Sequence, residues 1–395
     1  MSKNLYLFTA EYPYNKKENF LEDEINYLAG EFDSITIYPL SARGLLRPTP
    51  SNCKVDDGLC KGKLLKKVRA FVGIYRALPF YWKEYFNKGV YKSWSKTKSM
   101  LLNMLVCSYY MHSANIRSLK RNLKKNDVVY FYWGVAYNTI APFFKGRAKL
   151  ISRFHGDWDL WTPTGEEGYK PQRQALLSSL DCAVFISSKG RDFFQRIYPK
   201  VATKVFHLGS RDIGIVRKSK DGVLRIVSCS TVYPLKRVPL IFQSVCCLTE
   251  QRVKWTHLGG GVDFEKLKKM VKSHPDNIDV ELTGYLTLDQ VFEYYYNNPV
   301  DLFVNLSTNE GVPVSIMEAI SQDIPVVATN VGGNSEIVTE ETGCLVSANP
   351  TPDEVKNAIL KVVNAQGLKP RAFWKREFCA EKNYLSFAKF ISKEL

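Results

Sequence analysis

Short apolar runs alternate with segments of helical periodicity along the whole chain. Residues 17–32, for example, place apolar side chains four positions apart, which is one face of a helix. The apolar runs predict buried strands at 4–10, 34–40, 127–133, 148–156, 182–188, 224–230, 253–260, 278–284, 300–307 and 324–330. Strands that alternate with helices form βαβ units and parallel sheets covered on both faces. The pattern therefore predicts an α/β fold.

A polar, glycine-containing stretch without a strand pattern, residues 209–222, divides the chain. The length of 395 residues also exceeds what one hydrophobic core usually organises. We expect two doubly wound Rossmann-like domains, residues 1–210 and 222–375, facing across a cleft that holds the ligand. Residues 376–395 have a helical pattern, and we expect them to cross back to the first domain.

Composition narrows the class of protein and its compartment. The chain is 45% hydrophobic and 24% charged, and its longest mostly apolar stretch, residues 101–111, is too short for a bilayer span. The apolar run at the start is shorter than a secretory signal requires. Nine cysteines without a CxxC pair indicate reduced thiols. These features predict a cytoplasmic protein.

The net charge of +16 is concentrated in one segment. Residues 61–98 hold eleven Lys or Arg, nine aromatic residues and one acid, Glu84. This clustering favours an anionic membrane surface over nucleic acid as the partner. Apolar residues at helical spacing, with a kink expected at Pro79, predict an amphipathic helix. The alternative is a helix that packs on its own sheet and leaves a solvated basic back.

The most specific segment begins where a predicted strand ends. Glu310 follows the strand at residues 300–307, and a helix starts with Val314 and Ser315. The free amides at a helix N-terminus favour a phosphate. The turn Gly311-Val312-Pro313 joins this strand to the helix, and we expect it to contact the ligand as well.

A second carboxylate, Glu318, lies eight residues after Glu310 inside the same predicted helix. Two carboxylates beside an anion site are explained by a ligand that also carries hydroxyls, one acid for a sugar and one for a ribose. The pair matches the E-x7-E signature, and its context resembles family 4 of the retaining glycosyltransferases with two Rossmann-like domains (GT-B type), in its capsule, colanic-acid and lipopolysaccharide branch.

This resemblance implies how the carboxylates and the substrates are used. It implies that Glu310 positions the donor sugar and that Glu318 holds the nucleotide ribose. The donor would be a UDP- or GDP-linked hexose, with no resident cofactor. The acceptor would be a lipid-linked oligosaccharide or another envelope glycan, reached at the inner face of the membrane.

The segment SCSTVYPLKRVPL resembles the strand-loop-helix in which a lysine reaches the donor pyrophosphate. The resemblance assigns this role to Lys236. Many relatives have Gly-Arg where this chain has Cys229-Ser230, so we expect the second basic group to be absent or replaced by Arg237. The alternative for Lys236 is an exposed loop lysine.

Weaker motifs end other predicted strands. His155 resembles a residue that contacts the donor sugar, supported by Asp157 or Asp159, although a structural histidine is the alternative. The glycine run around Gly260 lacks the third glycine of a dinucleotide loop, and the resemblance implies a tight turn at the cleft. Leu286 resembles a position that frames the nucleotide base, or else serves packing.

The loop after the first strand, residues 9–13, replaces the Gly-Gly of many relatives. We expect it to face the acceptor, with Asn19 and Glu24 as candidate contacts.

The mechanism implied by the resemblance is displacement at the anomeric carbon with retention. Lys236 and the amides of Val314 and Ser315 would stabilise the departing diphosphate. We also expect the reaction to require no metal. The alternatives are a nucleotide-sugar epimerase of the same architecture, or a non-enzymatic basic protein that binds membrane or nucleic acid.

Overall fold

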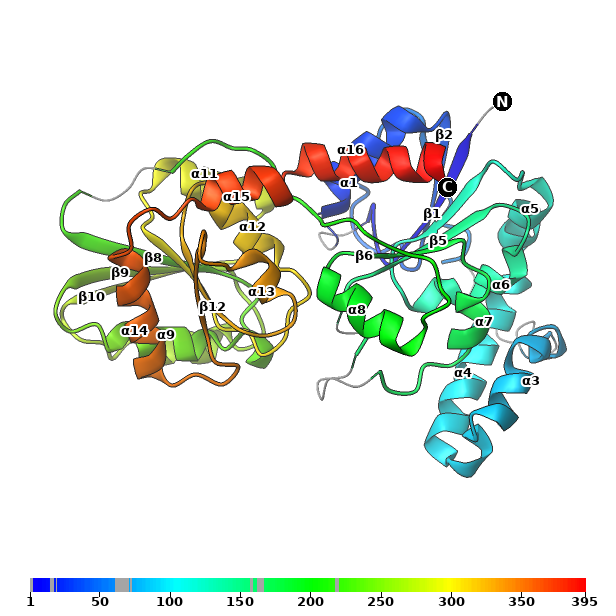
Figure 1. The fold of residues 1–395 in the computed structure, drawn as a ribbon, viewed down its shortest axis with the longest axis horizontal. Helices are drawn as coiled ribbons and strands as arrows, with labels where there is room; N and C mark the ends of the chain where they lie inside the picture. The colour runs from blue at the N-terminus through cyan, green and yellow to red at the C-terminus, as the bar shows by residue number, and fades with distance from the viewer. Residues whose placement is uncertain are drawn as a thin grey trace. The chain divides into compact units, whose positions relative to one another are not determined.

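The computed structural model describes residues 3–14, 18, 20–60, 71, 73–156, 159–161, 167–216 and 220–395. The chain divides into two compact units (Figure 1). The first unit comprises Met1–Phe206 and Tyr384–Leu395, and the second comprises His207–Asn383.

The first unit is built on a seven-stranded parallel sheet with the order β3-β2-β1-β4-β5-β6-β7. All residues of the central strand β4 are buried, as expected for a parallel sheet covered on both faces. The strands are β1 (Asn4–Thr9), β2 (Ser34–Pro39), β3 (Cys53–Val55), β4 (Val128–Phe131), β5 (Lys149–Phe154), β6 (Cys182–Phe185) and β7 (Thr203–Val205).

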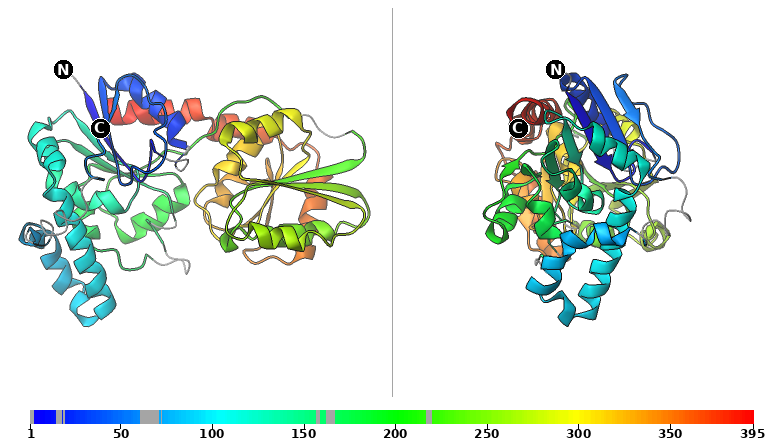
Figure 2. Two further views of the ribbon diagram at one scale, coloured as in Figure 1. Left: turned by 180° about the vertical axis from the view of Figure 1, so that it is seen from behind. Right: turned by 90° about the vertical axis from the view of Figure 1, so that its right-hand side faces the viewer.

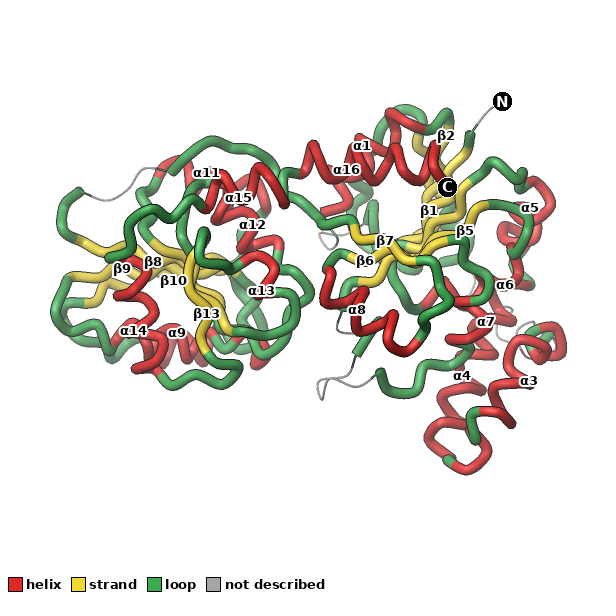
Figure 3. The backbone as a smooth tube through the Cα atoms, viewed as in Figure 1, coloured by secondary structure: helices red, strands yellow, loops and turns green. Residues whose placement is uncertain are grey.

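Helices cover both faces of this sheet (Figure 3). The α-helices are α1 (Phe20–Glu31), α3 (Leu78–Asn87), α4 (Trp94–Met111), α5 (Ala114–Asn122), α6 (Ala141–Phe144), α7 (Arg173–Leu177) and α8 (Ser188–Ile197). Short 3-10 turns are η1 (Ile74–Arg76), η2 (Val90–Lys92) and η3 (Ala136–Ile140). One hydrophobic cluster joins α4, α5 and α6 to the sheet, and another joins α1 to it.

The end of the chain completes the first unit. Helix α16 (Ala380–Lys389) continues into a π-helical turn, η5 (Phe390–Glu394). The Phe387 ring lies 5.3 Å from the Tyr130 ring, and Phe390 and Ile391 are buried in the same cluster. Burial of these apolar side chains fixes the tail on the face that α1 also covers.

The second unit has a six-stranded parallel sheet with the order β10-β9-β8-β11-β12-β13. Its strands are β8 (Val223–Cys229), β9 (Arg252–Leu258), β10 (Ile278–Gly284), β11 (Leu302–Asn305), β12 (Val326–Thr329) and β13 (Gly343–Val346). Its helices are η4 (Pro234–Lys236), α9 (Val238–Cys246), α10 (Phe264–Met270), α11 (Leu288–Asn297), α12 (Val314–Ser321), α13 (Asn334–Ile337), α14 (Pro352–Val363) and α15 (Pro370–Glu377). Helix α9 packs beside α14, and α12 packs beside α15 (Figure 1).

The predicted α/β fold class is confirmed, and each predicted strand coincides with a strand of the structure. The sequence missed β3, β7 and β13. Each lies at the edge of its sheet and is only partly buried, so it lacks the apolar run of a central strand. The kink expected at Pro79 is wrong, because Pro79 lies in the first turn of α3, where its missing amide costs no hydrogen bond. Within the described residues, no helix combines the length and apolarity needed to cross a membrane.

Candidate functional site

The strand order of the second unit changes direction between β8 and β11. From β8 the chain proceeds outward through β9 and β10, whereas from β11 it proceeds the other way through β12 and β13. Loops that leave the carboxyl ends of such neighbouring strands diverge and open a crevice for a ligand. The loop after β8 carries Lys236, and the loop after β11 carries Glu310.

These two side chains meet. Lys236 Nζ lies 2.5 Å from Glu310 Oε1, and Asn305 Nδ2, at the end of β11, lies 3.4 Å from the same oxygen. Glu310 is only 8% exposed, so its carboxylate depends on these partners for compensation of its charge. The structure thus brings together Lys236 and Glu310, which were predicted from separate sequence motifs. It also places Asn305 beside them, which was not predicted from the sequence.

Helix α12 starts directly after Glu310. Pro313 is its N-cap, and the first hydrogen bond of the turn runs from the Ile316 amide to the Pro313 carbonyl. The amides of Val314 and Ser315 precede that bond, and both residues are half-buried. They are therefore the orphan donors of the helix N-terminus, which favour an anion.

Glu318 lies on the same helix and is buried. The charges that act on the thiol of Cys229, at the end of β8, show which groups lie near Glu318. Burial raises the pKa of the Cys229 thiol, the carboxylate of Glu318 raises it further, and the ammonium of Lys236 opposes this effect. Glu318 and Lys236 thus both act electrostatically on one side chain at the end of β8.

Arg237 forms hydrogen bonds with several loops of the second unit. Its backbone is left-handed, with φ of 47°, and its Nε donates to the Leu306 carbonyl at 2.6 Å. Nη2 donates to the carbonyls of Ser307 and Ala348 at 3.0 and 2.8 Å, and Nη1 to the Asn349 side chain at 3.2 Å. The guanidinium therefore ties the loops after β11 and β13 to η4, and the expectation that it replaces a second phosphate ligand stays a prediction.

Glycines allow the loops around the site to approach one another closely. Gly332 has φ of +50°, and a Cβ atom there would lie 1.7 Å from the Glu310 carbonyl oxygen. The Gly333 amide donates to the Gly311 carbonyl at 2.7 Å, so the loop after β12 rests on the turn of Gly311 and Val312. Neither glycine was predicted from the sequence to have a role, although both follow a predicted strand.

The glycine run after β9 also serves close packing. A Cβ on Gly259 would lie 2.0 Å from the Ser230 carbonyl oxygen, and one on Gly260 would lie 3.1 Å from the Tyr285 amide nitrogen. The run thus lets the ends of β8, β9 and β10 approach one another, which brings Leu286, just beyond β10, to the same edge of the sheet.

The buried side chain of His257 forms hydrogen bonds with the end of β8 and the residue that follows it. The Ser228 hydroxyl lies 2.9 Å from His257 Nδ1, and His257 Nε2 lies 3.1 Å from the Ser230 carbonyl. A carbonyl only accepts, so Nε2 carries the proton and Nδ1 accepts from the serine. Burial lowers the pKa of His257 to about 4, opposed by its bond to Ser230, so the ring is neutral at pH 7.

The sheet of the first unit has its own change of direction, between β1 and β4. A cavity of about 560 Å³ lies there, lined mainly by aromatic and aliphatic side chains such as Phe8, Phe131 and Tyr137. Glu18 organises its rim. The carboxylate accepts from the amides of Ala10, Glu11 and Tyr12 at 3.2, 2.7 and 2.7 Å, and from Trp133 Nε1 at 2.5 Å. Neither Glu18 nor Trp133 was predicted from the sequence.

His155 follows β5 in the first unit. Its Nε2 lies 3.0 Å from the Tyr132 carbonyl, and its ring lies 4.4 Å from the Trp133 ring. Burial, and then the positive charge of Arg153, lower the pKa of His155 to about 3. Asp159 holds the turn in place by accepting from the His155 and Gly156 amides at 2.9 Å each.

The two candidates for the loop after β1 fare differently. Glu24 does not reach that loop, because its side chain is completely buried and pairs with Arg153 at 2.5 Å. Asn19, like Asp157, lies outside the described residues.

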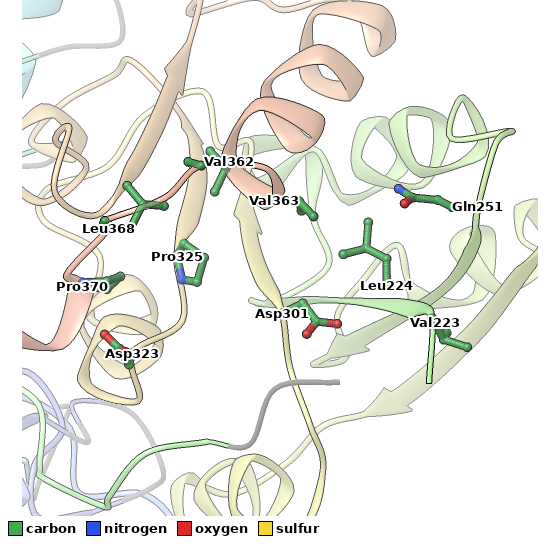
Figure 4. Close-up of a pocket in the computed structure, with 13 residues that line it drawn as sticks. Val223, Leu224, Gln251, Asp301, Asp323, Pro325, Val362, Val363, Leu368 and Pro370 are labelled. Atoms are coloured by element: carbon green, nitrogen blue, oxygen red, sulfur yellow. The ribbon is translucent and has the colours of Figure 1, made fainter. Parts of the chain in front are cut away.

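A second cavity in the second unit, of about 340 Å³, lies at the amino ends of β8, β11 and β12 (Figure 4). Its lining, all within the described part of the chain, includes the carboxylates of Asp301 and Asp323 and no Lys or Arg. An anionic ligand would be repelled there, so the cationic carboxyl end remains the candidate site.

Comparison with known proteins agrees with this choice of unit. Residues 215–377 match the family described as "Glycosyl transferases group 1". The second unit thus carries a glycosyltransferase group 1 domain. The domain contains Lys236, Glu310 and Glu318.

Curated relatives share parts of the chain. A putative colanic acid biosynthesis glycosyltransferase, WcaL of Escherichia coli K12, is 26% identical over 51% of this chain and 52% of its own length. The O-antigen biosynthesis glycosyltransferase WbnH of Escherichia coli is 34% identical over 27% of this chain and 28% of its own. A phosphatidylinositol N-acetylglucosaminyltransferase component of Arabidopsis thaliana is 28% identical over 38% of this chain. The alignment spans 33% of the length of that plant relative.

Solved structures resemble the whole chain. The lipopolysaccharide outer core galactosyltransferase WaaB matches with a TM-score of 0.68 at 14% identity, over 100% of both chains. Anabaena HepE in complex with UDP-glucose matches with a TM-score of 0.63 at 14% identity, over 100% of both. At this identity the likeness shows the fold, and the chain has the GT-B fold.

Proposed function

We propose that the protein transfers a hexose from a nucleotide-diphosphate sugar to a glycan or lipid-linked acceptor in cell-envelope polysaccharide biosynthesis. The observation that carries the proposal is the Lys236–Glu310 pair at the switch point of the group 1 domain, beside the N-terminus of α12. The Lys236 ammonium and the unpaired amides at the start of α12 can bind a diphosphate, and the carboxylates of Glu310 and Glu318 can accept hydrogen bonds from hydroxyls.

In the proposed reaction an acceptor hydroxyl oxygen forms a bond to the anomeric carbon as the bond from that carbon to the β-phosphate oxygen breaks. The electron pair of the broken bond leaves with the diphosphate, which takes up the hydroxyl proton. Lys236 and the amides of Val314 and Ser315 face the growing charge and stabilise the transition state. Glu310 binds hydroxyls of the sugar, and Glu318 binds the ribose of UDP or GDP. Retention of configuration follows the resemblance to the E-x7-E enzymes.

Lys236 is paired with Glu310, so donor binding must rearrange the pair. The lysine would turn to the diphosphate, and the released carboxylate would take the sugar hydroxyls in its place. This exchange keeps the buried carboxylate hydrogen-bonded in both states, which avoids the penalty of an unpaired buried charge.

For the acceptor we propose the cavity at the switch point of the first unit, whose rim is the loop after β1.

His155 is neutral at physiological pH, since its pKa is about 3. Its Nε2–H donates to the Tyr132 carbonyl, which leaves Nδ1 as the acceptor that the ring offers to a hydroxyl of the donor sugar.

The relatives support the substrate class. WcaL and WbnH carry names of envelope-polysaccharide enzymes, and HepE was solved with UDP-glucose. We therefore propose a cytoplasmic protein that works at the inner face of the membrane and needs no divalent ion. The group 1 match disfavours the epimerase and the non-enzymatic basic protein.

The test is release of free nucleoside diphosphate from a panel of UDP- and GDP-hexoses, with and without EDTA. We expect one donor to be hydrolysed above background in both conditions. Conversion of the sugar to an epimer without release of diphosphate would contradict the proposal, and loss of activity in EDTA would contradict its metal-free form.

A further inference from the structure

Helices α3 and α4 form a hairpin that is inserted between β3 and β4 and projects from the rest of the first unit (Figure 2). Its tip carries large aromatic side chains that lie in water rather than in the core. Trp82 is 62% exposed, Phe86 50%, Tyr91 52% and Trp94 77%. The Trp82 and Phe86 rings lie 5.0 Å apart, so part of this apolar surface is continuous.

Further exposed apolar side chains lie along α4, beyond Lys98. Leu102 and Val106, at four-residue spacing from each other and in register with Trp94, are 55% and 41% exposed, and Leu101 beside them is 39% exposed. Large aliphatic side chains thus lie on one face of α4 and are only partly covered by the described residues of the first unit.

The charges on the hairpin are of one sign. The exposed charged residues of the described segment 73–98 are all basic: Arg76, Lys83, Lys88, Lys92, Lys96 and Lys98. The one acid of that segment, Glu84, is buried, and its Oε1 accepts from the Tyr169 hydroxyl at 2.6 Å. The surface offered to a partner is therefore more positive than the sequence total suggests.

The opposite face of the hairpin is anchored. Tyr81, Met100, Met104 and Cys107 are buried in the core of the first unit. The Tyr81 hydroxyl also donates to Asn103 Oδ1 at 2.6 Å, which joins α3 to α4. The exposed aromatic residues therefore stand on a packed support. The sequence alternative, a helix whose apolar stripe packs on its own sheet, is wrong for Phe71, Tyr75, Leu78 and Trp82, which are exposed. Tyr85 of the same stripe is half-buried against the core of the first unit. Residues 61–70 and 72 lie outside the described residues.

We infer that the tip of the α3–α4 hairpin docks on the surface of an anionic lipid bilayer. Lysines at the tip would be attracted to acidic headgroups, while Trp82 and Trp94 enter the interface, where tryptophan is favoured. Single-stranded nucleic acid also binds basic surfaces with aromatic residues. The aliphatic row of Leu101, Leu102 and Val106 favours lipid, because it offers bases neither stacking nor hydrogen bonds.

The test is sedimentation of the full chain with vesicles of phosphatidylcholine alone and of phosphatidylcholine mixed with phosphatidylglycerol. We expect binding to the mixed vesicles only, and release as the salt rises from about 0.1 M to about 1 M, because the screening length falls from about 10 Å to about 3 Å. No donor sugar is present, so the result does not depend on the proposed enzyme activity.

Two variants locate the surface. Replacement of Lys83, Lys88 and Lys98 by Glu should lower the partition coefficient on mixed vesicles at least tenfold. The matched control replaces Lys269, Lys272 and Lys361, exposed lysines of the second unit, by Glu and so makes the same change in net charge; it should retain binding within threefold. Trp94→Ser, a single exposed change, should weaken binding severalfold and gives a second reading if the triple variant misfolds.

Three outcomes would overturn the inference. These are equal binding to the neutral vesicles, no binding to either kind, and equal loss in the control variant. Binding of a single-stranded RNA that is tighter than vesicle binding and is lost in the Lys83, Lys88 and Lys98 variant would assign the surface to nucleic acid instead.

Discussion

Lys236 and Glu310 stand 2.5 Å apart, although 74 residues separate them in the chain. The pair joins the loop after β8 to the loop after β11, the two strands between which the sheet order reverses. A cation and a carboxylate at that place can exchange partners when a diphosphate and a sugar enter together.

Glu310→Gln should lower turnover by about two orders of magnitude or more, because a misplaced donor sugar loses its reactive geometry. Donor affinity should stay within about tenfold, or about 1.4 kcal/mol, since the diphosphate contacts remain. Steady-state kinetics and calorimetry check both. Glu340→Gln, on an exposed side chain of the same unit, is the control. Near-normal turnover of Glu310→Gln would remove the residue from the site.

Glu318→Ala should weaken the binding of nucleoside diphosphate by about 1.5–3 kcal/mol, the typical contribution of a hydrogen bond to a charged group. Titration calorimetry with UDP and GDP measures it, and Glu318→Gln separates loss of charge from loss of volume. Wild-type affinity in both variants would refute the ribose assignment.

Lys236→Ala should lower turnover more than donor affinity, because the charge that the lysine answers grows in the transition state. Rates under saturating donor, compared with the affinity for the donor, test this split. Lys269→Ala, at an exposed position of α10, should change neither. An unchanged rate in Lys236→Ala would place the phosphate-binding cation elsewhere.

Gly332→Ala should displace the turn that holds Glu310, since the new Cβ would lie 1.7 Å from the Glu310 carbonyl oxygen. Gly367→Ala is a matched control. That glycine also has a positive φ, +81°, but nothing within 4 Å of the new Cβ, so it reports backbone strain alone, about 1–2 kcal/mol. Thermal unfolding and donor binding should both be worse in Gly332→Ala. Equal behaviour of the two variants would show that the loop yields without cost.

Acid should destabilise the second unit through His257. Its pKa is about 4 in the folded protein and about 6.5 when unfolded, so the unfolded chain binds the extra proton between these values. The stabilisation is therefore complete above about pH 6.5 and is lost as the pH falls towards about 4, by up to about 1.4 kcal/mol per pH unit. Denaturant unfolding at several pH values checks this, and His257→Asn should have a shallower slope than the wild type. Identical slopes would show that the histidine is protonated in the fold.

The sequence by itself determined the elements and the local part of the site. Central strands are buried on both faces, so their apolar runs stand out, and the start of α12 after Glu310 was readable from one continuous segment. Edge strands such as β3 and β7 escaped because half-exposed strands carry no such run.

Only the tertiary structure decided which groups share the site. Neighbouring loops are selected by the order of strands in the sheet, and local periodicity does not encode that order. For this reason the pairing of Lys236 with Glu310, and the use of Arg237 to tie the loops after β11 and β13 together, became visible only in the fold. The same holds for Glu84, whose burial depends on the face by which α3 packs on the first unit and leaves the hairpin surface purely basic.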